Sequence, residues 1–479
     1  KPGAQINGWA FTQFDGTVYW DNAGVVTLGN VPQKFNSLLA WKTTQQALKK
    51  SSLPKPQQDI LKITPNKRSA PQQKQLLDYF IEHVYTKTRP TFDKLHKDLA
   101  ATRGQLQQLE KSIPSTLVMQ EKAAGRLDTF LLVRGEYDKP DKNQKLQAGV
   151  PASLPQLPEG APANRLALAR WLVDPAHPLT ARVTVNRFWQ RYFGIGIVKT
   201  AGEFGSQGDW PSHPKLLDWL ATEFIRSGWD VKAMQKLIVM SGAYRQSSRV
   251  TAELYRRDPE NRLLARGPRF RLDAEMIRDN ALVIGGLLNQ QIGGKSVRPY
   301  QPGGLWKAVG YTGSNTVNFK QDHGNALYRR SMYTFWKRTS PPPSMALFDA
   351  PSREECSVRR ERTNTPMQAL TLMNDVQYVE AARNFAQRML TEGGKTPHER
   401  ITYAFRTATA RNPDAAEMSV FLEVLQSHLK EFRSNKEAAT KLVSLGESKR
   451  NEKLDAAELA AYTMLGNLIL NLDETVTKG

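Results

Sequence analysis

The chain has 479 residues, a length that exceeds one compact core and predicts about two to four domains. Apolar residues make up 40% and charged residues 24% of the composition, which excludes collagen, a long coiled coil and wholesale disorder. The formal net charge is +21, and no apolar run approaches the roughly 18 residues that a membrane-spanning helix needs.

Residues 1–31 place aromatic and β-branched residues between glycines and asparagines, a composition typical of short strands. Because so few residues cannot form a sheet domain alone, we expect them to be the terminal strands of a β domain. Residues 32–115 are predicted to be a helical linker. Within it, apolar side chains recur in steps of three and four, which predicts a helical hairpin or a short coiled coil, within the chain or between chains. These side chains are Phe92, Leu95, Leu99, Thr102, Leu106, Leu109 and Ile113.

Residues 116–163 are expected to be an extended and irregular connector that marks a domain boundary. The runs 117–119 and 129–133 are apolar and partly β-branched, which is typical of strands. Residues 134–163 are rich in proline, glycine and charge and have no periodicity, so we expect no regular element in them.

Residues 164–397 are predicted to form the main domain, and residues 398–479 a helical C-terminal part. Helical periodicity and end signals predict helices over 164–173, 181–193, 215–226, 231–241 and 274–288. Residues 331–336 resemble a strand. A capping box at Thr365 and Gln368 predicts a helix that reaches about residue 390. The fold class that follows is mainly α (α+β), a helical domain with irregular loops and a few short strands.

Positive charge is concentrated in the middle of the chain. Residues 161–380 contain 31 basic and 19 acidic residues, a net of +12, and 23 of the 31 basic residues are arginine. Guanidinium groups pair bidentately with carboxylate, phosphate or sulfate. Two interpretations stay open: a surface for an acidic polymer, and a solvated surface with internal arginine pairs.

The predicted helix 181–193 carries the first candidate site. Its polar side chains recur every four residues on one face, with arginines and aromatic residues beside them. Such a face can bind a sugar or a nucleotide, or it can hold neighbouring loops through buried hydrogen bonds, and we favour the second interpretation. The candidate residues are Arg182, Asn186, Arg187, Trp189 and Gln190.

The second candidate site lies in the segment 340–365, where acidic and arginine residues crowd together before a capped helix. Because the start of a helix attracts anions, the segment predicts a site for a carboxylate, sulfate or phosphate. The alternative, which we favour, is a network of arginines and acids that locks a long loop. The candidate residues are Asp349, Arg353, Glu354, Arg360, Asn364 and Thr365.

No catalytic group can be assigned from the sequence. The single cysteine, Cys356, excludes an internal disulfide and a C-x-x-C-H haem attachment in these residues, and we expect it to be small and buried. None of the seven histidines has zinc-site spacing, so no metal site is predicted. His177 and His213 each precede a proline, and we interpret both as turn or cap residues.

Several long motifs resemble one family. Residues 164–248, which begin "NRLALARWLVDPAHPLTARVTVNRFWQRYFG", strongly resemble the C-terminal domain of large secreted planctomycete proteins. So do "RGPRFRLDAEMIRD", "YRRSMYTFWKRTSPPPSMALFDAPSRE", "RRERTNTPMQALTLMND" and "LGNLILNLDET". The resemblance extends from residue 164 to the end, and more loosely over residues 60–158.

The resemblance implies a multidomain, exported protein with a signal peptide, a cytochrome-c-like haem domain, a further helical domain and often a laminin-G-like sheet domain. Residues 1–31 fit the end of that laminin-G-like domain. The chain starts at Lys1 without a signal-peptide pattern, so we expect a processed or truncated product. The resemblance implies no cofactor in this chain, haem c in the upstream part, and a periplasmic or cell-surface location. It supplies no catalytic residues.

These observations favour an exported binding or accessory component of a cytochrome-c-containing assembly. Its partners would be the upstream fragment or other chains of the assembly, and an acidic protein or anionic polysaccharide at the arginine-rich domain. One alternative is a polysaccharide-active enzyme, in which Asp349, Glu354 or Asp375 converges with Arg353 and Arg360. Nucleic-acid binding is the second alternative, and we consider it the weaker of the two.

Overall fold

The structure is a computed structural model that describes residues 34–48, 51–120 and 127–479. It divides into two compact units, residues 1–128 and 129–479, and the division falls inside the predicted connector 116–163. The described residues are mainly helical with two small two-stranded sheets, which confirms the predicted fold class. The strands predicted within residues 1–31 lie outside the described residues.

The first unit has a small helical core. Side-chain caps begin two of its helices: Ser37 accepts a hydrogen bond from the start of α1, and Ser69 and Gln72 form a capping box on α3. Trp41, Leu76 and Phe80 are its most buried side chains. Its helices are α1 (Leu38–Ala47), α2 (Lys55–Lys62), α3 (Ala70–His83) and α4 (Arg89–Ser112).

Helix α4 confirms the helix predicted from the steps of three and four residues, but none of its residues is buried. The leucine and isoleucine side chains of the predicted seam are between 47% and 59% exposed. Because most helix stability in proteins comes from packing an apolar face, α4 gains little stability from such packing.

The second unit begins with a hairpin that the sequence did not fully predict. Strand β1 (Thr129–Leu132) pairs antiparallel with β2 (Pro140–Leu146) across a turn that contains the 3-10 helix η2 (Val133–Gly135). Strand β2 corrects the expectation of an irregular segment from residue 134 onward. Its sequence, PDKNQKL, lacks apolar alternation, so only pairing with β1 defines it as a strand. Residues 117–119 are not a strand, and their side chains are almost fully exposed.

A helical core follows the hairpin. Val185, Trp189, Leu217 and Phe224 pack at its centre. The boundaries predicted over 164–173, 181–193, 215–226 and 231–241 hold to within one residue, whereas the helix predicted over 274–288 ends at Ile284. The helices are α5 (Arg165–Leu172), α6 (Thr180–Phe193), α7 (Pro214–Arg226) and α8 (Val231–Met240), followed by the short α9 (Ala252–Arg257).

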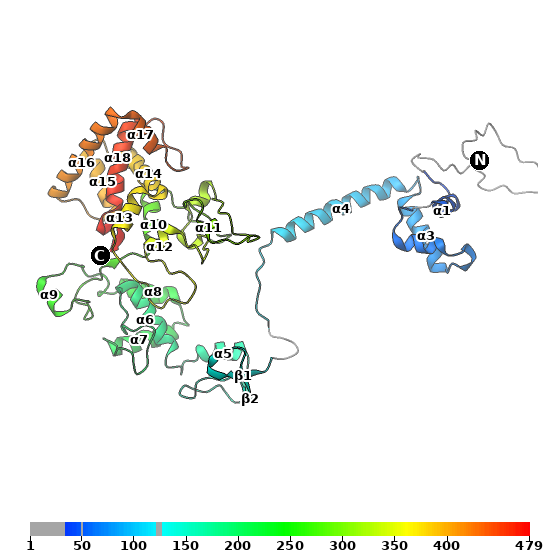
Figure 1. The fold of residues 1–479 in the computed structure, drawn as a ribbon, viewed down its shortest axis with the longest axis horizontal. Helices are drawn as coiled ribbons and strands as arrows, with labels where there is room; N and C mark the ends of the chain where they lie inside the picture. Colours follow the sequence, from blue (N-terminus) through cyan, green and yellow to red (C-terminus); the bar gives the residue numbers. More distant parts are fainter. Residues whose placement is uncertain (1–33, 49–50, 121–126) are drawn as a thin grey trace, which may run out of the picture. The chain divides into compact units, whose positions relative to one another are not determined.

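The larger core surrounds α18, which packs against α14, α16 and α17 (Figure 1). Small residues allow this approach: a Cβ atom on Gly466 of α18 would lie 3.1 Å from the carbonyl oxygen of Ala382 in α14. Its helices are α10 (Ala274–Ile284), α11 (Leu305–Ala308), α12 (Pro343–Leu347), α13 (Pro366–Asn374), α14 (Val376–Glu392), α15 (Pro397–Thr409), α16 (Ala415–Ser434), α17 (Lys436–Val443), α18 (Ala456–Leu470) and α19 (Asp473–Val476). Strand β3 (Phe270–Arg271) pairs antiparallel with β4 (Thr477–Lys478) and fixes the chain end.

Three further local predictions were wrong. The helix expected to run from the capping box to residue 390 is broken at Asp375, which has extended backbone and caps α14 through its side chain. The strand expected at 331–336 is a 3-10 turn, η4 (Ser331–Tyr333), with one isolated bridge from Thr334 to Val297. Cys356 is exposed, because the loop that carries it runs over the surface.

The larger core predicts a strong effect of Phe385→Ala. Phe385 is fully buried on α14, so its truncation should lower the free energy of unfolding by about 3–5 kcal/mol in urea denaturation. The matched control is Val420→Ala on α16, where the side chain is 55% exposed and the change should stay within about 0.5 kcal/mol. Equal effects of the two substitutions would contradict the packing described.

Candidate functional site

On α6, the predicted polar face is used inside the fold. Asn186 is fully buried, and its amide donates to the carbonyl of Val198 (3.0 Å) while its oxygen accepts from the Val198 amide (2.9 Å). The neighbouring Gly196 lies so close that a Cβ atom would fall 2.6 Å from the Asn186 side chain. Asn186 therefore clamps the chain after α6.

The other α6 candidates follow the same pattern, with one exception. Arg182 donates to Asp218 (2.7 Å) and to the carbonyl of Pro178 (2.6 Å). Trp189 is buried with its ring stacked 4.0 Å from that of Phe193, and Gln190 is buried on the same helix. Only Arg187 of the five is exposed. The α6 face thus serves the helical core.

The arginines of the 340–365 loop converge on two carboxylates that the sequence did not single out. Arg360 donates to both oxygens of Glu275 (2.6 and 3.1 Å), and Arg353 lies 3.7 Å from the same carboxylate. The adjacent Asp273 pairs with Arg191 of α6 and lies 3.7 Å from Arg360. We call Asp273, Glu275 and their arginine partners Arg191, Arg353, Arg360 and Arg362 the arginine–acid network.

Charge pairing sets the ionisation of Glu275. Burial acts to raise its pKa, but the hydrogen bonds and charge of Arg360, aided by Arg353, outweigh burial and hold the pKa below its ordinary value. Glu275 is therefore an ionised partner of arginine and not a proton donor. The network fits the predicted lock on a long loop.

The remaining candidates of this loop have separate partners. Asp349 accepts hydrogen bonds from the amide (2.7 Å) and hydroxyl of Thr363, and Asn364 accepts one from Arg271 (2.9 Å). Thr365 caps α13, as predicted. Glu354 lies 3.6 Å from Arg338. The carboxylates of Asp349, Glu354 and Asp375 thus share no common arginine.

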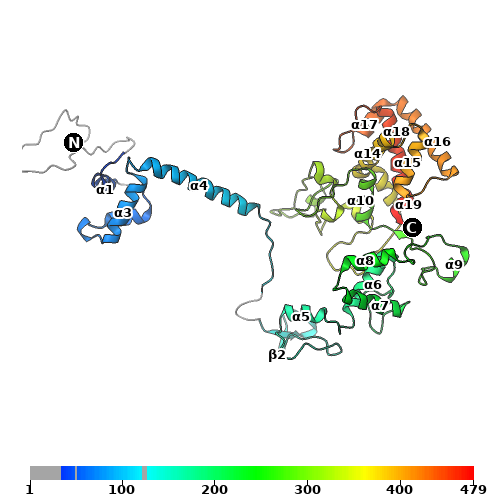
Figure 2. The ribbon, with the colours of Figure 1, turned by 180° about the vertical axis from the view of Figure 1, so that it is seen from behind.

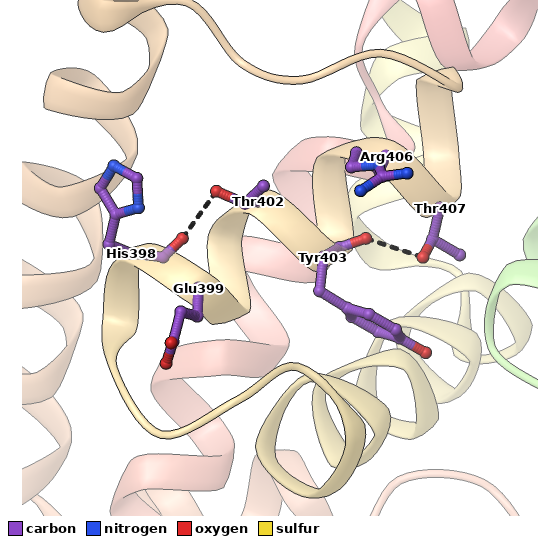
Figure 3. Close-up of a pocket in the computed structure, with 6 residues that line it drawn as sticks. All are labelled: His398, Glu399, Thr402, Tyr403, Arg406 and Thr407. Atoms are coloured by element: carbon purple, nitrogen blue, oxygen red, sulfur yellow. Dashed lines mark hydrogen bonds between the residues drawn. The ribbon is translucent and has the colours of Figure 1, made fainter.

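A surface depression lies along α15. Its lining side chains all come from that one helix, and two of the hydroxyls donate back to their own helix (Figure 3). Glu399 is engaged in the capping box with Thr396. The depression therefore lacks convergent groups. Its lining residues are His398, Glu399, Thr402, Tyr403, Arg406 and Thr407.

A second pocket lies where the connector folds back on α5. We call it the connector pocket. Its volume is about 560 Å³, and its walls combine the proline-rich residues 155–162 with one face of α5. The indole N–H of Trp171 donates to the carbonyl of Pro155 (2.6 Å) and so fixes the connector on the helix. Most of the wall is apolar: Pro155, Leu157, Pro158, Ala161, Pro162, Leu166, Ala167, Trp171 and Ala176.

His177 supplies a hydrogen-bond donor in this pocket. Its Nδ1 accepts from the backbone amides of Leu179 (3.3 Å) and Thr180 (3.2 Å), so Nδ1 carries no proton and the proton sits on Nε2. His177 is only 8% exposed, its ring meets the Trp171 ring edge-on with centroids 4.5 Å apart, and Nε2 has no hydrogen-bond partner in the described part of the chain. A buried donor without an acceptor is costly, so His177 is the polar group of this wall whose hydrogen bonding is incomplete.

The sequence predicted the capping contact of His177 but not its place in a pocket. The proline after His177 indicated a cap, and the Nδ1 contacts confirm it. The free Nε2 became visible only with the connector in place, because the wall comes from residues 155–162. The proline cluster at 155, 158 and 162 was the available signal, and it was interpreted only as an irregular connector.

The arginine–acid network predicts a pH-dependent stability. The pKa of Glu275 is lowered by folding, so its stabilisation is complete above the ordinary value of 4.5 and is lost as the pH falls through the lower, folded-state pKa. The difference in the free energy of unfolding between wild type and Glu275→Gln should therefore shrink from about pH 6 to about pH 3. Urea denaturation across this range measures it.

The control substitution is Glu361→Gln. The Glu361 carboxylate pairs with Arg359 at the surface (3.2 Å), so its loss should change the free energy of unfolding by less than about 1 kcal/mol at neutral pH. If Glu275→Gln changes the free energy of unfolding as little as this control does at neutral pH, the network does not lock the loop.

Comparison with known proteins gives one match. No curated protein and no solved structure matches the chain. Residues 164–425, more than half of the chain, match the family described as "PSD1: Protein of unknown function (DUF1553)". The match begins where the main domain was predicted to begin, one residue before α5. The chain therefore belongs to the PSD1 (DUF1553) family.

Proposed function

We propose that this chain is a binding component of an exported assembly, and that a partner polypeptide docks at the connector pocket. The observation that carries the proposal is the mostly apolar connector pocket, whose wall includes His177 with an Nε2 that has no hydrogen-bond partner in the described residues. A peptide segment supplies what the pocket lacks, because it offers a backbone carbonyl beside an apolar side chain.

The charges around the pocket favour a polypeptide over an acidic polymer. Arg170 lines the pocket together with Glu159 and Asp174, so cationic and anionic groups are mixed there. An acidic polymer would meet two carboxylates at this site. A neutral, partly apolar segment meets no such repulsion.

The surface around the pocket supports the same conclusion. Leu166, Leu168, Leu172 and Val173 on and after α5 are each between 40% and 56% exposed. Helix α5 lies beside the β1–β2 hairpin, which exposes further apolar side chains such as Leu131 and Leu146 (Figure 1 and Figure 2). Exposed apolar side chains that gather near a pocket favour a protein partner.

The identity of the assembly is proposed from the sequence resemblance. Export to the periplasm or cell surface, and a partner that carries haem c, would follow from the planctomycete architecture that the motifs resemble. No helix in the described residues is long and apolar enough to cross a membrane.

His177→Asn tests the docking site. The asparagine oxygen replaces Nδ1 as the acceptor for Leu179 and Thr180, so the cap is kept while the Nε2–H donor is lost. Short peptides selected on the wild-type chain from a random phage-displayed library should bind His177→Asn about fivefold more weakly, or worse, because a net hydrogen bond is worth about 1 kcal/mol. Fluorescence anisotropy of labelled peptides measures this loss.

Two further variants sharpen the experiment. Ala161→Trp fills the pocket and should abolish peptide binding. His213→Asn is the matched control, since His213 also precedes a proline at a helix start but does not line the pocket. Failure to select any peptide, or equal affinity of selected peptides for wild type and both pocket variants, would refute the docking site.

A second candidate function, contact with an acidic partner, is favoured by arginines that the fold leaves unpaired. Arg245 and Arg249 are exposed and have no carboxylate partner in the described residues, and Arg256 bonds only its own helix. Tyr255 beside them is 61% exposed. We propose this segment, 245–257, as the surface for an acidic protein or anionic polysaccharide.

Heparin is a suitable probe for this surface. Replacing Arg245, Arg249 and Arg256 together by glutamine should weaken heparin binding and flatten its dependence on salt concentration, because fewer counterions are released. The control replaces Lys215, Lys232 and Lys236, which are exposed on α7 and α8, and removes the same charge. Equal losses in both triple variants would show that net charge alone governs the binding.

A further inference from the structure

Two histidines and a glutamate meet in the first unit, where the end of α3 lies beside α4. Glu82 and His83 end α3, and His96 lies in the second turn of α4. One ligand atom from each of the three side chains lies within 4.8 Å of the other two. The side chains are between 35% and 42% exposed, so a small ion can reach them.

The distances are close to those of a coordination site. Nε2 of His96 lies 2.7 Å from Oε1 of Glu82, and Nε2 of His83 lies 3.7 Å from the same oxygen. Bonds of about 2.0–2.2 Å to a tetrahedral Zn²⁺ place ligand atoms roughly 3.4 Å apart. Modest rotations of exposed side chains therefore bring the three groups to one metal ion.

Neighbouring rings hold the histidines in place. The rings of His83 and His96 stack with their centroids 4.8 Å apart. The ring of Tyr79, one turn earlier on α3, lies with its centroid 4.5 Å from that of His83. Phe92 lies 6.4 Å from His96 on α4. Both helices thus orient a ligand, which is the preorganisation that a metal site needs.

The chemistry of the three side chains also suits a metal ion. They offer one carboxylate and two imidazoles. Carboxylate and imidazole together are the ligand types that zinc and its first-row neighbours prefer.

We infer that Glu82, His83 and His96 form a site for a divalent transition metal, with Zn²⁺ as the ion that fits the ligand set best. Three protein ligands leave a coordination position for water or for a group from a partner. The ion would replace the Glu82–His96 hydrogen bond and cross-link the end of α3 to α4. Because no residue of α4 is buried, such a link would fix how α4 leaves the unit.

Competition with a chromophoric zinc chelator tests the site on the full chain. The wild-type chain should remove one equivalent of Zn²⁺ per chain from the chelator, and the double variant His83→Ala/His96→Ala should remove none. The exposed positions tolerate alanine, and circular dichroism verifies that the double variant is folded. His428→Ala is the matched control, because His428 also contacts a glutamate, Glu431, at 3.2 Å but has no second histidine there.

Glu82→Gln gives a second readout. Glutamine keeps the size of the side chain but removes the charge, so Zn²⁺ should still bind and be released at a lower chelator concentration. Co²⁺ substitution adds spectroscopic evidence, since the visible absorption of bound Co²⁺ should disappear in the double histidine variant. The inference is overturned if the wild-type chain withdraws no Zn²⁺, or if His83→Ala/His96→Ala withdraws as much as wild type or as His428→Ala.

Discussion

The arginine–acid network joins the two cores of the second unit, and the arrangement of that unit depends on it. Asp273 and Glu275 stand at the start of α10 in the larger core, whereas Arg191 comes from the last turn of α6 in the smaller one. The 353–362 loop adds Arg353, Arg360 and Arg362 to the same two carboxylates. Removing either carboxylate would leave several cations facing one another in a half-buried space, which is more costly than losing a surface pair.

The same principle accounts for much of the arginine content of the domain. Arg278 is buried and donates to the carbonyls of Leu327 (2.6 Å) and Arg329 (2.9 Å), so it holds a loop onto α10. Arg383 lies beside the fully buried Glu380, which accepts hydrogen bonds from the hydroxyl of Tyr328 and the amide of Ser448. Burial, followed by the Glu380 contact, raises the pKa of Tyr328 to about 12, which keeps this hydroxyl a donor at neutral pH. Arginine thus replaces regular structure as the means of fixing long loops.

Local chemistry explains which features were predictable from the sequence. The capping box at Thr365 and the glycine after α6 report directly on helix ends, so those ends were predicted closely. The break at Asp375 was not, because the apolar pattern continues through it and only the side-chain cap reveals a new helix. The partners of Arg360 lie 85 residues away in the chain, and pairing at such distance leaves no periodic trace. His83 and His96 were missed for the same reason, since a turn separates them and no short spacing signals a shared ligand.

The connector pocket lies across the start of the family match. The family match begins at residue 164, yet the wall formed by residues 155–162 precedes it. His177 and Trp171, which supply the donor and hold the wall in place, belong to the matched part. The hydrogen-bond donor is therefore encoded by the domain, whereas the shape of the pocket depends on the segment before it. A change in the connector would therefore reshape the pocket while leaving His177 and the two cores in place. If a partner docks here as proposed, the connector determines which segment fits, and it does so through a wall that the Trp171 hydrogen bond holds on α5.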